Sequence, residues 1–198
     1  MSSSRASRMP AAQRREQILE VAMKVFARAG YAQAGTAEIA AEAGISEPTI
    51  YRHFDSKKSL YIAVIAHNRD EFLEAWQQII EGSPDPLAAI DRIGEWYRNQ
   101  MAEQPDMLRI RFRSLNAADD PEIAAVVRDG YRAVTDKVRR LFQQAVERGQ
   151  VPAEVNVGQL AMMFMAMGGL FDVLMQLDMK PELESGDLHG VFRRLGLP

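Results

Sequence analysis

Apolar residues recur at steps of three and four along most of the chain, which is the spacing of amphipathic helices. The first such stretch runs from about residue 11 to residue 29, and Gly30 is placed to end it. The alternation of a half-buried strand is almost absent, and the one alternating run, residues 109–113, also fits a helix through Leu108, Phe112 and Leu115. The pattern therefore predicts an all-α fold.

Caps and breakers divide the rest of the chain into further helices, giving about nine in all. Thr36 and Ser46 are placed to cap two short helices separated by Gly44, and Ser56 to cap a long one over residues 57–80. Prolines and glycines separate the later helices. These are expected near residues 86–103, 105–116, 120–148, 155–178 and 183–195.

The two short helices are marginal in isolation, so packing against the first and fourth helices must hold them. Two helices joined by the turn Gly44-Ile45-Ser46 match a helix-turn-helix, whose second helix enters the DNA major groove. Ile50 and Phe54 are predicted to face inward. The predicted outward residues are Pro48, Tyr51 and Arg52, with Glu47 and Thr49 at the tip. The alternative is a helical hairpin with solvated polar faces.

The distribution of charge favours the DNA-binding interpretation. The net charge is −3, but residues 1–60 hold nine Lys or Arg against six Asp or Glu. Residues 1–10 contain Arg5 and Arg8 and no apolar core of a signal peptide, so we expect a flexible basic arm there. Thr36 and Ser56 stand at helix starts, where free N–H groups attract phosphate, and Lys57 follows at once.

The stretch TAEIAAEAGISEPTIYRHFDSKKSLY, residues 36–61, closely resembles the DNA-binding domain of the TetR family of transcriptional repressors. The rest of the chain resembles that family in helix number and length. The resemblance implies a DNA-binding domain over residues 11–56 and a ligand-binding and dimerisation domain over residues 57–198. It also implies a homodimer on a palindromic double-stranded DNA operator, released when a small-molecule effector binds.

The resemblance also assigns residues to DNA contact. It places Thr36, Thr49, Tyr51, His53 and Lys57 on positions that commonly touch DNA. Glu47 falls on a base-reading position that varies among members, and the usual small residue is absent there, so the operator sequence is not implied. The complete predicted DNA-contacting set is Thr36, Ser46, Glu47, Pro48, Thr49, Tyr51, Arg52, His53 and Lys57.

Residues 155–178 contain four methionines within six positions. The segment is short for a membrane span and is broken by Asp172, so no membrane partner is expected. It fits a helix buried almost all round, at the centre of a domain or in a dimer interface, where Gly168 and Gly169 allow close approach. The family resemblance places residues 155–177 and 183–195 in a four-helix dimer interface.

Methionines and aromatic residues of the C-terminal half could line a pocket for an apolar or amphipathic effector, although ordinary core packing accounts for each of them taken singly. Arg109 and Arg113 lie four apart and could hold a ligand carboxylate, but pairing with surface acids is the favoured alternative. The predicted ligand-binding residues are Trp76, Trp96, Tyr97, Met101, Met107, Arg109, Phe112, Met163, Met167 and Phe171.

Two other classes of protein are alternatives. For an enzyme, the chain offers three histidines, none beside a recognisable nucleophile, and no Gly-rich phosphate loop, so neither catalysis nor a cofactor is predicted. His67 and Glu71 could supply two metal ligands, but such a pair is usually solvated. A helical lipid carrier without DNA binding would leave the first 60 residues unexplained. The chain has no cysteine, which suits a reducing cytoplasm.

Overall fold

The computed structural model describes residues 9–177, and within that range the chain forms eight α-helices and no strand. The all-α prediction is confirmed. The ninth predicted helix, 183–195, and most of the basic arm lie outside the described residues. The helices are α1 (Ala11–Gln33), α2 (Thr36–Glu42), α3 (Glu47–Tyr51), α4 (Lys57–Glu81), α5 (Pro86–Glu103), α6 (Pro105–Leu115), α7 (Pro121–Glu147) and α8 (Val157–Gln176).

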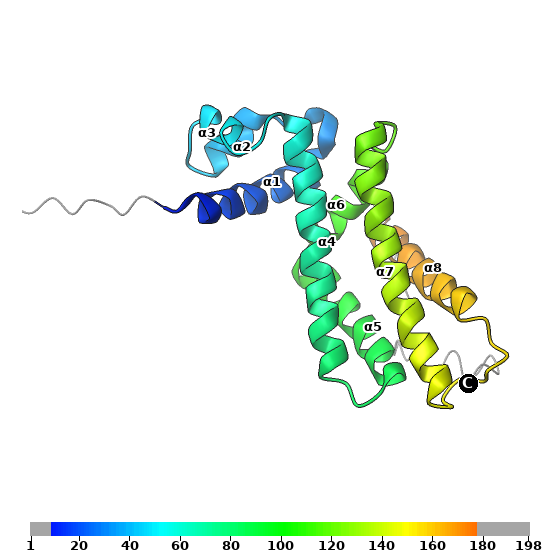
Figure 1. The fold of residues 1–198 in the computed structure, drawn as a ribbon. Coiled ribbons are helices and arrows are strands. Elements are labelled where there is room, and N and C mark those ends of the chain that lie inside the picture. Colours follow the sequence, from blue (N-terminus) through cyan, green and yellow to red (C-terminus); the bar gives the residue numbers. More distant parts are fainter. Residues whose placement is uncertain (1–8, 178–198) are drawn as a thin grey trace, which may run out of the picture.

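Helices α1–α3 gather at one end of the molecule around the start of α4 (Figure 1). Their apolar faces form one core cluster, in which Phe26 of α1, Ile39 of α2 and Ile50 of α3 are 0–1% exposed. Leu60 and Tyr61 at the start of α4 close this cluster, and neither is exposed. The two short helices are therefore stabilised by packing on their longer neighbours, as their length requires.

A second core cluster lies between the lower part of α4 and helices α5, α7 and α8. Phe72 and Trp76 of α4 are central to it, and Phe142 of α7 and Phe164 of α8 pack into it. Helix α4 thus contributes to both clusters, and α7 runs beside it (Figure 1). Helix α6 also reaches both, because Ile110 belongs to the first cluster and Met107 to the second.

The sequence signals at most helix ends act as expected. Ser56 and Ser59 exchange hydrogen bonds at the start of α4, with Oγ of Ser56 accepting from the Ser59 N–H at 3.0 Å. Asp85 caps α5 by accepting from the Ala88 N–H at 3.0 Å. Each of these side chains satisfies backbone donors that the first helical turn leaves free.

Gly30 interrupts the helix as predicted, with φ 76° and ψ 167°, and a short helical stretch follows this kink, so that α1 runs to Gln33. Two predicted caps differ from the structure. Ser46 holds the capping position of α3, but its side chain makes no capping hydrogen bond. Thr36 does not cap α2, because Gly35 holds the capping position and Thr36 is the first helical residue. The Thr36 hydroxyl instead donates to Glu47 of α3.

Helix α8 is not buried almost all round within this chain, so it does not fit the first predicted alternative, the centre of a domain, and the dimer interface stays a prediction. Met162, Leu170 and Val173 are 65%, 60% and 37% exposed. By length and composition alone, residues Val157–Leu174 would also suffice to cross a membrane. The helix packs one side on α7 and leaves an apolar face that nothing in residues 9–177 covers.

Candidate functional site

The turn between α2 and α3 sets the direction of α3. Gly44 adopts φ 65°, a left-handed conformation that glycine enters without strain, and the Ile45 N–H donates to the Ala40 carbonyl at 3.0 Å. From α1, the Gln17 side-chain amide donates to the Ala43 carbonyl at 3.2 Å. The end of α2 is therefore held both by its own backbone and by α1.

Helix α3 separates an inner from an outer face. Ile50 is 1% exposed and Phe54, just beyond the helix, is 5% exposed, as the sequence predicted. Tyr51 is 46% exposed, and Pro48 and Arg52 are also exposed. Three predicted outward residues thus lie on the exposed side of a segment that is anchored by two apolar side chains.

The Thr36 hydroxyl joins α2 to α3. It donates to Oε1 of Glu47 at 2.5 Å and lies 3.0 Å from the Tyr51 hydroxyl. Thr36 is itself 8% exposed, so its hydroxyl requires partners inside the protein. Glu47, at the tip of α3, is consequently held in one orientation by a neighbouring helix.

A concave surface of about 390 Å³ lies between the start of α1 and the outer face of α3. Arg52 donates to Thr49 Oγ1 at 2.9 Å, and the Ser46 and Thr49 hydroxyls lie 2.9 Å apart. No Asp or Glu is among its lining residues, so the surface attracts anions. The lining residues are Met9, Ala11, Arg14, Ile45, Ser46, Thr49, Arg52 and His53.

Two lysines at the start of α4 have different surroundings. Nζ of Lys57 donates to the Ala32 carbonyl at 3.2 Å and lies 5.0 Å from the centre of the Tyr31 ring. Lys58 pairs with Glu122 at 2.5 Å and with Asp120 at 3.3 Å, and the hydrogen bond to Glu122 raises the pKa of Lys58. Lys58 therefore connects α4 to the start of α7, while Lys57 contacts the last turn of α1.

A cavity of about 350 Å³, mostly apolar and partly open to solvent, lies between α4, α5, α6, α7 and α8. Four predicted pocket residues line it: Trp76, Tyr97, Met167 and Phe171. The other lining residues are Phe72, Ile93, Gly94, Arg98, Arg111, Tyr131, Val134, Phe164, Met165, Gly168, Gly169, Leu170 and Leu174.

The remaining predicted pocket residues lie elsewhere. Trp96 packs edge-on against Phe72 at 5.1 Å between ring centres. Met107 is buried in the core, and Phe112 lines neither this cavity nor the smaller one described below. Met163 is 42% exposed on the open face of α8. The side chain of Met101 lies outside the described residues.

The two predicted carboxylate-binding arginines also point away from the cavity. Arg109 is exposed and pairs with Asp106 at 3.3 Å, which was the favoured alternative for such a residue. Arg113 extends toward α1 and donates to the Arg28 carbonyl at 3.1 Å. The cavity receives Arg111 instead, on the opposite side of the same helix.

Arg111 was missed by the sequence analysis. Its guanidinium lies over three aromatic rings, 5.0 Å from the centre of Phe72, 5.7 Å from Tyr97 and 5.9 Å from Tyr131. It donates to the Tyr97 hydroxyl at 3.4 Å, and Tyr97 in turn donates to Asp172 of α8. The three polar groups form a chain from α6 through α5 to α8.

Burial and the neighbouring groups shift the pKa values of Tyr97, Asp172 and Arg111. Burial raises the pKa of Tyr97 above its ordinary value, and Tyr97 is therefore a neutral donor at pH 7. Burial also raises the pKa of Asp172, although the Tyr97 hydroxyl and Arg111 oppose the change. For Arg111, burial alone would lower the pKa, but Tyr97, Asp172 and Tyr131 outweigh it, and the pKa stays above its ordinary value.

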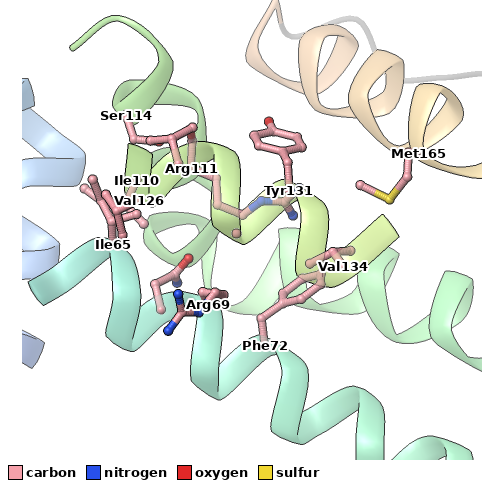
Figure 2. Close-up of a pocket in the computed structure, with 13 residues that line it drawn as sticks. Ile65, Arg69, Phe72, Ile110, Arg111, Ser114, Val126, Tyr131, Val134 and Met165 are labelled. Carbon is pink, nitrogen blue, oxygen red and sulfur yellow. The ribbon is translucent and has the colours of Figure 1, made fainter. Parts of the chain in front are cut away.

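A smaller cavity of about 50 Å³ adjoins the first between α4, α6, α7 and α8. Figure 2 shows Arg111 and Tyr131 beside it, with Phe72 on one side and Met165 of α8 across from them. Phe72, Arg111, Tyr131, Val134 and Met165 line both cavities. Arg111 therefore stands in the wall between them.

No group of three or more His, Cys, Asp or Glu side chains among residues 9–177 is arranged to hold a metal ion. His67 Nε2 lies 3.4 Å from Glu71 and 3.6 Å from Glu16. It makes no hydrogen bond within the described part of the chain.

Comparison with known proteins gives the family. The model of bacterial regulatory proteins of the tetR family matches residues 18–64. The transcriptional activator FasR of Mycolicibacterium smegmatis is 33% identical over 140 residues, covering 71% of this chain and 64% of FasR. The chain thus spans less than two thirds of that relative. The transcriptional regulator UidR of Escherichia coli is 22% identical over 161 residues, or 80% of this chain and 81% of UidR.

A solved structure shows the same fold over most of the chain. The regulator FadR of Bacillus subtilis, in complex with stearoyl-CoA, matches with a TM-score of 0.75 at 17% identity, covering 85% of this chain and 90% of FadR. The relatives are named as regulators and not as enzymes. With its helix-turn-helix, its all-α fold and these relatives, the chain belongs to the TetR family of transcriptional regulators.

Proposed function

We propose that this protein is a cytoplasmic, ligand-responsive repressor that binds a palindromic operator as a homodimer and leaves it when an effector enters the C-terminal cavity. The observation that carries the proposal is the pairing of two separate sites in one chain. One is the exposed outer face of α3 beside a cationic concave surface, and the other is the apolar cavity between the C-terminal helices.

The α3 surface has the properties that DNA binding requires. Helix α3 has five residues, and its outer face carries Thr49, Tyr51 and Arg52, which can donate to bases or phosphate. Arg14 of α1 lines the same concave surface. Cations placed around a protruding helix bind phosphate while the tip of the helix reaches the base edges.

The open face of α8 supports a homodimer. Exposed apolar residues on one helix commonly mark a protein interface, and a second copy of the chain would offer the same face in return. Such a twofold arrangement presents two copies of α3 to two half-sites of DNA. This is the reason to expect a palindromic operator.

The cavity supports an apolar or amphipathic effector. A volume of about 350 Å³ lies within the range of small-molecule sites, and its walls are mainly aromatic and aliphatic. The structure of FadR with stearoyl-CoA shows that this fold accommodates a long-chain acyl compound in another protein. We propose that a related amphipathic compound acts on this chain.

The proposal is tested by selecting binding sites from random double-stranded DNA with the full-length protein. The expected result is an inverted repeat whose half-site centres lie about one helical turn, roughly 34–36 Å, or a multiple of it apart. Arg52→Ala should weaken binding to the selected DNA, whereas Arg139→Ala, an exposed arginine on α7, should not. A protein that enriches no sequence and shows no salt-dependent DNA binding is not an operator-binding regulator.

The sign of regulation needs its own measurement, because FasR is named as an activator. A reporter gene placed behind the selected operator should be expressed less when the protein is present. Higher expression would make this chain an activator and would leave the rest of the proposal intact.

A further inference from the structure

We propose that the effector is an amphipathic carboxylic acid whose chain fills the apolar cavity and whose carboxylate binds Arg111. The inference rests on the proposed function only in taking this cavity as the effector site. It goes further by naming the head group of the ligand and the residue that selects it.

The charged side chains that line the two adjoining cavities are all cationic. The charged residues that line the larger cavity are Arg98 and Arg111, and those that line the smaller one are Arg69 and Arg111. No Asp or Glu lines either cavity. Arg69 is already paired with Asp70 at 2.7 Å. An apolar cavity with only cations in its walls favours a ligand that is apolar in its body and negative at one end.

Arg111 keeps part of its hydrogen-bonding capacity. A guanidinium carries about five N–H donors. Among residues 9–177, its side-chain partners are two neutral hydroxyls, that of Tyr97 at 3.4 Å and that of Tyr131, and none of the ion pairs includes Arg111. The rings of Phe72, Tyr97 and Tyr131 contact the cation through their faces, which stabilises its charge but does not replace a planar acceptor. A carboxylate is the acceptor that matches the paired donors of an arginine.

The carboxylate of Asp172 competes with the carboxylate of such a ligand for Arg111 and for the Tyr97 hydroxyl. It accepts from Tyr97 and adds to the negative potential at Arg111 without a direct ion pair. A ligand carboxylate on Arg111 would place a second anion near Asp172, and like charges at that range repel. The Tyr97 hydroxyl has one proton to donate, so the ligand and Asp172 also compete for it. Binding of the acid therefore acts on α8, the helix that carries the open apolar face.

The position of Arg111 should also make the site bind a free acid more tightly than the corresponding thioester. The carbonyl of an acyl-CoA thioester is a neutral acceptor, so it gains less from a partly buried guanidinium than a carboxylate does. The phosphates of coenzyme A are anionic, but they lie at the far end of the molecule from the acyl chain. Dodecanoate, dodecanol and dodecanoyl-CoA share one chain length and differ at the group that would meet Arg111.

The experiment measures binding of these three probes to the full-length protein by isothermal titration calorimetry, below the concentrations at which the probes aggregate. Dodecanoate should bind at least about tenfold more tightly than dodecanol, as one charge-assisted contact implies. Arg111→Met should remove this preference by weakening the acid and not the alcohol. Arg111→Lys should keep part of it, and Arg109→Met, an exposed change on the same helix, should keep all of it. Asp172→Asn should tighten binding of the acid.

Several outcomes would overturn the proposal: equal binding of acid and alcohol, failure of all three probes to bind, or equal weakening of acid and alcohol by Arg111→Met. The proposal would also be overturned if dodecanoyl-CoA bound more tightly than dodecanoate and lost affinity in Arg111→Met. That outcome would make acyl-CoA the ligand of this site. DNA binding by the unliganded protein is measured in parallel. Intact DNA binding with no acid preference rejects this inference alone, whereas absent DNA binding rejects the proposed function.

Discussion

At the scale of single residues, Glu47 has one hydrogen bond inside the protein and capacity for more. A carboxylate offers about four lone-pair positions. The Thr36 hydroxyl occupies one of them and fixes the orientation of the side chain. The outward oxygen lone pairs remain available to a cytosine amino group in the major groove, while they would repel phosphate. Thr36 is therefore expected to support base reading by positioning Glu47.

Glu47→Gln tests this role. Glutamine keeps an oxygen for Thr36 but removes the charge and adds a donor. We expect an altered preference at one base pair per half-site, worth about 1–3 kcal/mol, with non-specific binding equal or tighter. The measurement is the affinity for every single-base variant of the selected operator. Lys57→Ala is the comparison, because loss of a phosphate contact should weaken all sequences alike and reduce the salt slope by about 0.9 per contact. An unchanged base preference would remove Glu47 from base reading.

Asp172 makes stability depend on pH in a defined direction. Its folded pKa is raised mainly by burial, so the folded protein holds this proton more tightly than the unfolded chain does. The stabilising contribution is present below the unfolded pKa, about 3.9, and is lost as the pH rises through the folded pKa. An asparagine side chain does not titrate in this range. The melting temperature of Asp172→Asn relative to the wild type should therefore rise as the pH increases from about 4 and then level off above the folded pKa. A difference in melting temperature that stays constant or falls over this pH range would contradict the raised pKa of Asp172.

The arginines of α6 show what a single sequence cannot reveal about a site. Arg109, Arg111 and Arg113 alternate along the chain, and helical geometry puts the first and third on one face and Arg111 on the other. The helical period thus correctly predicted that Arg109 and Arg113 share one face of α6. It did not identify the buried member, because arginine is usually exposed and the aromatic rings that surround Arg111 come from α4, α5 and α7. That information exists only in the packing of distant segments.

At the scale of elements, the kink in α1 is a contact point between α1 and α6. Gly30 has a backbone conformation that is essentially restricted to glycine. A Cβ there would also lie 3.3 Å from the Arg113 guanidinium, which binds the Arg28 carbonyl. The last turn of α1 is thereby attached to α6, the helix that carries Arg111.

Gly30→Ala should therefore be more harmful than a comparable change in the helix-turn-helix. Gly44 also has positive φ, but a Cβ there meets no atom within 4 Å. We expect Gly44→Ala to cost about 1–2 kcal/mol of unfolding free energy from backbone strain alone. Gly30→Ala should cost about 1–3 kcal/mol from strain, and more from the contact with Arg113. Urea unfolding of both variants measures the difference, and an equal loss would show that Arg113 adjusts freely.

Helix boundaries were predictable where the signal is local. Residues 86–103 match α5, and α6, α7 and α8 end within two residues of the prediction, because Asp, Pro and Gly mark those ends. The errors occur where a local signal meets a tertiary demand. Thr36 could cap a helix, but Glu47 and Tyr51 of the next helix compete for its hydroxyl. Gly30 interrupts the helix where the sequence predicted, but the short helical stretch that follows the kink was not predicted.

At the scale of the whole molecule, helix α8 has an apolar face that residues 9–177 leave exposed to solvent. Met162 and Leu177 are 65% and 64% exposed, and Leu170 is similar. The sequence predicted burial from composition, and composition reports how apolar a helix is without saying which chain covers it. A second copy of the chain would resolve the difference, since the apolar face would be buried between subunits.

The homodimer is tested by placing a charge on that face. Met162 points away from the ligand cavity, so Met162→Glu should leave the fold and the cavity intact while putting an unpaired carboxylate from each subunit into the interface. The wild type should sediment as a dimer at micromolar concentration. The variant should have a dimer dissociation constant at least about a hundredfold higher, equivalent to about 2.7 kcal/mol, and should lose operator affinity because each half-site is then bound separately. Asn99→Glu adds the same charge to an exposed position of α5 and should change neither property. A monomeric wild type, or a Met162→Glu variant that remains dimeric, would place the interface elsewhere.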